Sequence, residues 1–326
     1  EHLKKIPTIP AAYAVRDAEP ENARIQIKGE PFRPGAEVPR KFPDILGGQM
    51  LPEEVAATGS GRLQLARWIT DPDNPLTARV IVNRVWQRHF GVGIVPSTSD
   101  FGLRGEPPTH PELLDWLAGE FIGSGWSIKH LQRLIMTSRT YRMSSQGFGE
   151  NVTIDPANRY HWRFNRQRLD AESIRDAVML IAGSLDRTPQ SEPYPIPPQS
   201  QWEYTQHHPF KDTYPSNRRS VYLMTKRLTP HTNIQTIDGP DPNVSTSDRE
   251  QSVTPLQALY FVNDQSLHEQ AAEYARSLLR ESSGDSQRAT LAFRTIVCRH
   301  PSADELSLML QHVDAVRRQM DDNPQS

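Results

Sequence analysis

The sequence has very little cysteine, since Cys298 is the single one among 326 residues. This excludes an internal disulfide, a multi-cysteine zinc site and the covalent attachment of a c-type haem within the chain. We expect no cofactor within this chain itself. Because Cys298 stands near the end of an apolar helical run, we expect it to be a core residue.

Long hydrophobic runs are also missing. No segment approaches the roughly 18 consecutive apolar residues that a bilayer-spanning helix requires, so we expect no membrane span in this chain. Hydrophobic residues make up 36% of the sequence, the mean hydropathy is −0.64, and 28 residues are proline. This composition predicts packed elements joined by long irregular connections. The first residue, Glu1, is not an initiator methionine and no signal-peptide pattern follows, so we expect it to be an internal point of a longer precursor.

Neither sign of charge is in excess, with 37 Lys and Arg against 39 Asp and Glu and a formal net charge of −2. No global field would draw the protein to nucleic acid, which is therefore not expected as a partner. The sequence also contains no glycine-rich phosphate loop, no serine nucleophile elbow and no His-Glu zinc helix. These absences remove the common nucleotide-binding, serine hydrolase and zinc protease motifs.

Apolar periodicity and capping signals predict a mainly α protein with two helical-bundle lobes, a few short β-strands and long Pro-rich ordered loops. We expect residues 1–60 to form an extended arm with short strands. Residues 61–145 should form an N-terminal helical lobe, and residues 146–326 a C-terminal helical lobe with long loops at 186–218 and 228–253. The polar, turn-rich residues 146–158 are the predicted hinge between the lobes.

Local signals place the individual elements. Strands are predicted at 24–28 and 220–224 from their alternation and flanking turn residues. Helix starts are indicated by Ser127, by Asp170, and by capping boxes that pair Thr109 with Glu112, Thr254 with Gln257 and Ser302 with Glu305. The resulting helices cover about 63–69, 76–90, 111–121, 127–140, 170–182, 255–262, 264–279, 286–297 and 302–320.

A cluster of basic and aromatic residues lies in the helix predicted at 76–90. Arg84 and Arg88 share a helix face at i, i+4, and His89 is their titratable neighbour. Two guanidinium groups on one face suit a carboxylate, a sulfate or sugar hydroxyls. The alternative, which we favour, is structural: these side chains would fix the loop that contains Asp100 and Glu106 to the bundle through buried ion pairs.

Asp100, Glu106 and His110 are the candidate catalytic residues. Paired carboxylates perform general acid and base work on glycosidic bonds, but this spacing is not diagnostic. Asp115 lies inside a predicted helix, where we expect it to pair with an arginine. His110, which precedes a proline at a helix start, more often has a local packing role at such a position.

Two predicted loops offer other candidates for chemistry. Asp238, Asp241 and Asn243, with Ser245, put oxygen donors on a short Pro/Gly-rich loop that suits a hard cation, with calcium as the candidate ion. The alternative is a set of Asx-type turns with an ion pair to Arg249. The second loop is rich in aromatic rings beside polar groups, a composition that suits sugar stacking, although the rings would also serve to attach the loop to the bundle. Its candidate ligand contacts are Trp202, Tyr204, His207 and His208.

Several runs of residues together carry a resemblance to a known family. They are 74–79 (NPLTAR), 83–86 (NRVW), 89–91 (HFG), 98–102 (TSDFG), 105–117 (GEPPTHPELLDWL), 125–127 (GWS), 134–142 (LIMTSRTYR), 168–172 (RLDAE), 238–243 (DGPDPN) and 255–259 (PLQAL). They resemble the PSD-one domain, the domain of unknown function fifteen fifty-three, found at the C-terminal end of large planctomycete-type cytochrome c proteins. The resemblance extends over nearly the whole chain from about residue 23.

The resemblance implies an extracytoplasmic location, in the periplasm, at the cell surface or secreted. It also implies a cytochrome c-like module with haem c on the same precursor, and a contact with polysaccharide. It supplies no catalytic residues. We therefore expect an extracytoplasmic interaction or scaffold domain, with a polysaccharide-active enzyme, hydrolytic or redox through the attached haem module, as the alternative.

Overall fold

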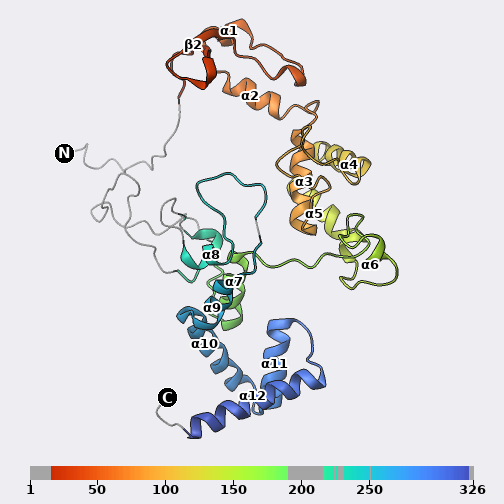
Figure 1. The fold of residues 1–326 in the computed structure, drawn as a ribbon, viewed down its shortest axis with the longest axis vertical. Coiled ribbons are helices and arrows are strands. Elements are labelled where there is room, and N and C mark those ends of the chain that lie inside the picture. The colour runs from red at the N-terminus through yellow and green to blue at the C-terminus, as the bar shows by residue number, and fades with distance from the viewer. Residues whose placement is uncertain (1–15, 190–215, 224, 226–230, 250, 323–326) are drawn as a thin grey trace, which may run out of the picture. The chain divides into compact units, whose positions relative to one another are not determined.

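The computed structural model describes residues 16–189, 216–223, 225, 231–249 and 251–322. These residues form a mainly helical fold, as predicted, and the only sheet among them has two strands. The chain divides into two compact units, Glu1–Arg166 and Gln167–Ser326, which we call unit 1 and unit 2. Figure 1 shows the succession of helices in each unit.

Unit 1 begins with a small hairpin. Strand β1 (Ala23–Gln26) pairs antiparallel with β2 (Pro34–Val38), which confirms the first part of the strand predicted at 24–28; its last two residues belong to the 3₁₀ helix η2 (Ile27–Gly29). Every residue of β1 is exposed, so this sheet is not part of the core. The short helix η2 (Ile27–Gly29) lies between the two strands, and η3 (Asp44–Leu46), α1 (Glu53–Thr58) and α2 (Arg62–Ile69) follow the hairpin.

The core of unit 1 is a bundle built around α3 (Thr77–Phe90). Ala78, Val82, Trp86 and Phe90 recur every four residues and are at most 5% exposed, so they form one buried face of this helix. The other helices are α4 (Pro111–Gly123), α5 (Ile128–Thr137), η4 (Thr140–Arg142) and α6 (Asn151–Ile154). Helix α3 packs against α4 and α5, and the loop residues Ile94 and Val95 complete the core.

The helix caps of unit 1 follow the sequence in part. Gly91 ends α3 with a φ of 83°, and the Ser127 hydroxyl accepts a hydrogen bond from the His130 N–H at 3.2 Å. The capping box predicted at Thr109 is wrong, because the residue that caps α4 is His110. Instead, the Thr109 hydroxyl donates to the Ile94 carbonyl at 3.2 Å. It therefore joins the two ends of the loop between α3 and α4 rather than starting a helix.

Unit 2 is a second set of helices. They are α7 (Ala171–Ala182), η6 (Ser220–Tyr222), α8 (Thr232–Thr236), α9 (Pro255–Asn263), α10 (Gln265–Glu281), α11 (Asp285–Val297) and α12 (Ala303–Asp322). Helix α7 packs against α10, and α11 packs against α12. The caps predicted at Asp170 and at Thr254 with Gln257 are confirmed, and the second is a complete capping box.

Two predictions for unit 2 are wrong. The strand expected at 220–224 is replaced by the 3₁₀ helix η6, because the Asp176 carboxylate accepts hydrogen bonds from the backbone N–H and the hydroxyl of Ser220. Cys298 is exposed rather than buried, since it lies just beyond α11 with a φ of 57° and terminates the helix. In both cases the alternation or spacing of apolar residues predicted the wrong conformation or environment for the residue.

The boundary between the units falls after Arg166, and residues 146–158 belong to unit 1. Backbone and side-chain contacts explain this division. The Phe164 N–H donates to the Ser144 carbonyl at 2.9 Å, and the Asn165 amide donates to the Phe90 carbonyl at 3.1 Å. Within the described parts of the chain, no helix combines the length and apolarity that crossing a bilayer demands.

Candidate functional site

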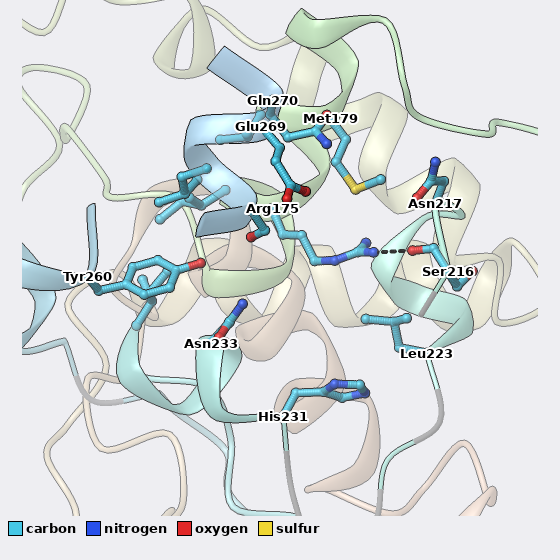
Figure 2. Close-up of a pocket in the computed structure, with 15 residues that line it drawn as sticks. Arg175, Met179, Ser216, Asn217, Leu223, His231, Asn233, Tyr260, Glu269 and Gln270 are labelled. Carbon is cyan, nitrogen blue, oxygen red and sulfur yellow. Dashed lines mark hydrogen bonds between the residues drawn. The ribbon is translucent and has the colours of Figure 1, made fainter. Parts of the chain in front are cut away.

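Unit 2 contains a cavity of about 410 Å³, which we call the unit-2 pocket. It lies among α7, η6, α8, α9 and α10, and Figure 2 shows the side chains around it. One part of its wall is aliphatic and includes Ile174, Val178 and Leu223. The polar part is contributed by Arg175, Ser216, Asn217, His231, Asn233, Tyr260, Ser266, Glu269 and Gln270.

Arg175 determines the shape of one side of the pocket. One guanidinium nitrogen donates to the Arg218 carbonyl and to the Ser220 hydroxyl, each at 3.1 Å, and the other donates to the Ser216 carbonyl. Burial lowers the pKa of the Arg175 guanidinium, while the Asp176 carboxylate beside it acts in the opposite direction. Arginine remains charged under such a shift. The side chain therefore holds the segment 216–220 against α7.

The other sides of the pocket present groups with free hydrogen-bonding capacity. Figure 2 shows Tyr260 of α9, Asn233 of α8 and Glu269 of α10 pointing towards the space beside Arg175. Burial raises the pKa of the Tyr260 hydroxyl, so this group is neutral at physiological pH and both donates and accepts. Glu269 is exposed and accepts a hydrogen bond from the Gln265 amide at 2.9 Å.

The polar and the aliphatic groups of the pocket lie side by side. Hydroxyl and amide groups beside aliphatic side chains can bind and orient a polyhydroxylated ligand. The described part of the chain holds no group of three or more His, Cys, Asp or Glu residues that could bind a metal ion. The aromatic candidates Trp202, Tyr204, His207 and His208 lie outside the described residues. They precede Ser216, a pocket residue, in the sequence.

The acidic loop proposed for calcium has other partners. Asp238 accepts hydrogen bonds from Arg168 at 3.0 Å, from the Ser252 N–H at 2.9 Å and from the Gln257 amide at 3.1 Å. The hydrogen bonds from Ser252 are the main cause that lowers the pKa of Asp238. Asp241 accepts from the N–H and the amide of Asn243, at 2.8 and 2.9 Å, which is an Asx turn. These contacts match the turn interpretation.

The ion pair expected between this loop and Arg249 is wrong. Arg249 donates to both carboxylate oxygens of Glu172, at 2.6 and 3.0 Å, and lies 3.6 Å from Asp170. It therefore joins its own segment to the start of α7. The bidentate geometry is the one that arginine favours with a carboxylate.

The structural interpretation of Arg84 and Arg88 is also wrong. Both side chains are exposed on α3, and neither forms a salt bridge with any residue that the structure describes. Asp100 instead accepts from the Gly102 N–H at 2.7 Å, and Glu106 lies 3.9 Å from Arg159. His89 is partly buried against Tyr141, and burial lowers its pKa. The two guanidinium groups stay candidates for binding an anion.

The remaining candidates lie at or near a small cavity in unit 1. Glu106, Thr109, Arg159 and His161 line this space of about 230 Å³. The ring of His110, whose Nδ1 lies 2.9 Å from the Thr109 hydroxyl, packs against His161 with 5.8 Å between ring centroids. Asp115 forms the expected ion pair with an arginine, Arg79, at 2.7 Å.

His161 is a site residue that the sequence did not reveal. Its Nε2 accepts a hydrogen bond from the Trp86 indole at 3.3 Å, and its Nδ1 is buried without a hydrogen-bond partner among the described residues. Burial lowers its pKa, and the neighbouring His110 adds to this effect. His161 and Asn158 both have positive φ, at 52° and 55°. Asn is enriched at positive φ, so Asn158 is a residue of this loop whose type indicated a tight turn near His161.

Comparison with known proteins agrees with the motifs. No curated protein and no solved structure matches the chain. Residues 61–313 match the family PSD1, described as a protein of unknown function (DUF1553). The match includes the bundle around α3 and the unit-2 pocket, and it covers well over half of the sequence. This chain therefore belongs to the PSD1 (DUF1553) family.

Proposed function

We propose that this chain is an extracytoplasmic interaction domain that binds polysaccharide through the unit-2 pocket. The observation that carries the proposal is the composition of that pocket, in which Tyr260, Asn233 and Gln270 lie beside an aliphatic wall. Neutral hydroxyl and amide groups exchange hydrogen bonds with sugar hydroxyls, while aliphatic groups pack on the C–H faces of the sugar ring. A cavity of about 410 Å³ falls in the size range of ordinary ligand sites.

We further propose that the precursor attaches this domain to a cytochrome c-like module, which would hold haem c. The motifs shared with planctomycete-type cytochrome c proteins support this arrangement. Haem staining and peptide mapping of the native precursor, isolated with an antibody against this chain, would test it. A native protein that is free of covalent haem, or that fractionates with the cytoplasm, would contradict the proposal.

Binding is a better-supported function than catalysis. An enzyme acting on polysaccharide would need at least two of Asp100, Glu106, His110, Asp238 and Asp241 in one open cleft. In the described structure Asp100 and Asp241 accept hydrogen bonds within their own turns, and Asp238 binds Arg168. Of the other two, Glu106 lines the small cavity of unit 1 and lies 3.9 Å from Arg159, while His110 is not among the lining residues. We therefore expect the isolated chain to bind glycans without converting them.

A glycan array with purified variants tests the pocket. Asn233→Ala and Tyr260→Phe each remove one hydrogen-bonding group, and we expect each to weaken glycan binding about 3- to 10-fold, the effect of one lost hydrogen bond. Gln235→Ala is the matched control, because Gln235 lies on the same short helix but does not line the pocket.

Two results would overturn the proposal. Absence of binding to every glycan would remove polysaccharide as the ligand class. Binding that Asn233→Ala and Tyr260→Phe leave unchanged would remove the pocket as the site. A Trp202→Ala, His207→Ala double variant on the same array would then test the predicted aromatic loop.

A further inference from the structure

Besides the small cavity lined by His161, unit 1 contains a second, open cavity of about 690 Å³. Its lining is entirely polar apart from one glycine, and it includes two guanidinium groups and no carboxylate. The residues are Ser145, Gln146, Gly147, Arg163, Asn165 and Arg166. Neither Arg163 nor Arg166 forms a salt bridge within the described structure, so no direct ion pair neutralises the two positive charges that share this cavity.

Arg163 is held in place by contacts other than a salt bridge. Its guanidinium lies over the Trp162 ring, 5.1 Å from the ring centroid, and donates to the Pro156 carbonyl at 3.3 Å. The Trp162 indole is itself fixed, since it donates to the Asp155 carbonyl at 2.8 Å. An arginine that is already stacked and oriented loses less side-chain entropy on binding an anion.

The loop that carries both arginines is rigidly built. The amide group of Asn158 donates to the Arg163 carbonyl at 2.7 Å and to Asn165 at 2.9 Å, and its oxygen accepts from the Arg163 N–H at 3.2 Å. Asn158 and His161 both have positive φ, a conformation that is uncommon outside glycine and persists where the surroundings fix it. Such conformations gather at ligand-binding sites.

The acidic group nearest in sequence, Asp155, interacts with Arg163 through its charge but forms no salt bridge with it in the described structure. Both carboxylate oxygens of Asp155 accept backbone hydrogen bonds, from Arg159 at 2.9 Å and from Tyr160 at 3.0 Å. The surrounding sequence is also basic, because residues 77–166 contain eleven Arg and Lys against seven Asp and Glu. The local field therefore favours a negative ligand.

We infer that this cavity binds an oxyanion, a carboxylate, sulfate or phosphate ester carried on a polyhydroxylated ligand. Arg163 and Arg166 take the charged oxygens, and Ser145 and Gln146 take neighbouring hydroxyl groups. The site is separate from the unit-2 pocket in position and in ligand charge. The inference therefore stands whether or not the unit-2 pocket binds glycan.

The test compares four polymers on the full chain: polygalacturonate, dextran sulfate, polyphosphate and neutral dextran. We expect binding to at least one of the three anionic polymers, and we expect this binding to weaken as salt rises. An Arg163→Gln, Arg166→Gln double variant should bind at least 10-fold more weakly, because each lost charge-assisted hydrogen bond costs about that factor. Arg163→Lys, which keeps the charge but loses the planar fork, should show a smaller loss.

Arg104→Gln is the control, since this exposed loop arginine lies outside the cavity; it removes one positive charge, half of the change in the double variant. We expect less than a 2-fold effect from it. Far-ultraviolet circular dichroism of each variant confirms that it is folded. Equal binding by the double variant and Arg104→Gln would overturn the inference, as would a wild-type chain that binds none of the three anionic polymers. Asn233→Ala, which alters the unit-2 pocket, should leave anionic binding unchanged.

Discussion

Asn83 gives the most direct test of how unit 1 is held together. The side chain is 0% exposed in the core face of α3. Its oxygen accepts a hydrogen bond from the Val95 N–H at 2.8 Å, and its amide donates to the Val95 carbonyl at 2.9 Å. Val95 is itself only 3% exposed. Asn83 therefore supplies both partners that a buried loop residue needs, as a neighbouring strand would in a sheet.

Asn83→Ala should destabilise unit 1 strongly. Two buried backbone groups of Val95 lose their partners, and an unsatisfied buried group costs about 1–3 kcal/mol. The cavity left by the amide adds about 1 kcal/mol. The expected loss is therefore about 3–7 kcal/mol, a large part of the roughly 5–15 kcal/mol that stabilises a typical domain. Gly93→Ala should act on the same contact, because an added Cβ would lie 2.6 Å from the Asn83 amide nitrogen and from the Val95 carbonyl oxygen.

Urea unfolding followed by tryptophan fluorescence is the appropriate measurement. Five of the six tryptophans lie within residues 1–166, so the signal reports mainly on unit 1. Gln132→Ala is the control, because this side chain is exposed on α5 and should change the free energy of unfolding by less than about 0.5 kcal/mol. If Asn83→Ala proves no more destabilising than Gln132→Ala, the pairing with Val95 does not stabilise the core and the reasoning fails.

Three further predictions concern charged groups. Asp238→Ala should lower the free energy of unfolding of unit 2 by about 1–3 kcal/mol, measured by circular dichroism in urea, because Arg168 and the Ser252 N–H lose their acceptor; an unchanged transition would contradict this. Burial lowers the pKa of His161 below 6.5, so the unfolded chain binds more protons and the stability of unit 1 should fall as pH drops below 6.5. His161→Asn should flatten that dependence between pH 5 and 7.5, and an equally steep profile would refute it. Hydrogen bonds from Arg299 lower the pKa of Glu305 to about 2, so its stabilising effect should be complete above 4.5 and lost as pH falls towards 2. Arg299→Gln should raise that pKa in an NMR carboxyl titration, whereas an unmoved titration would show that the pair is absent in solution.

Features that depend on a few consecutive residues could be predicted from the sequence. Asp170, Ser127 and Thr254 each cap the helix that they were expected to start, because the acceptor and the N–H lie three residues apart. The apolar spacing of α3 likewise indicated a buried helix before any partner was known. Local hydrogen bonds and helix periodicity need no knowledge of the tertiary structure.

Features that depend on distant residues could not be predicted in this way. Thr109 has the sequence of a capping box, but its hydroxyl bonds to Ile94, 15 residues earlier. Ser220 follows a strand-like pattern, but Asp176, 44 residues earlier, bends the chain there into η6. In each case a hydrogen bond across the unit outweighs a local preference, which is typically worth less than about 1 kcal/mol.

The candidate sites were even harder to predict from the sequence than the helix starts. The residues that line a cavity come from segments that are far apart in the sequence. The unit-2 pocket, for example, is lined by residues of α7, α8, α9 and α10 and by residues on both sides of η6. Arg84 and Arg88 were assigned to the nearest acids in the sequence, yet Asp100 is used by its own turn. Proximity in sequence is a poor guide to ion pairs, because folding brings Glu106 to Arg159 and leaves Arg84 and Arg88 exposed.

The net charge of the whole chain conceals a difference in charge between the two units. The formal charge of −2 is the sum of +3 in residues 1–166, with 21 Lys and Arg against 18 Asp and Glu, and −5 in residues 167–326, with 16 against 21. Screening confines electrostatic effects to about 8 Å at physiological salt, so a ligand at this cavity responds to the charges near Arg163 and Arg166 rather than to the net charge of the whole chain. A balanced composition therefore does not exclude an anionic ligand there. It follows that salt should weaken binding at this cavity and leave binding of a neutral glycan in the unit-2 pocket nearly unchanged.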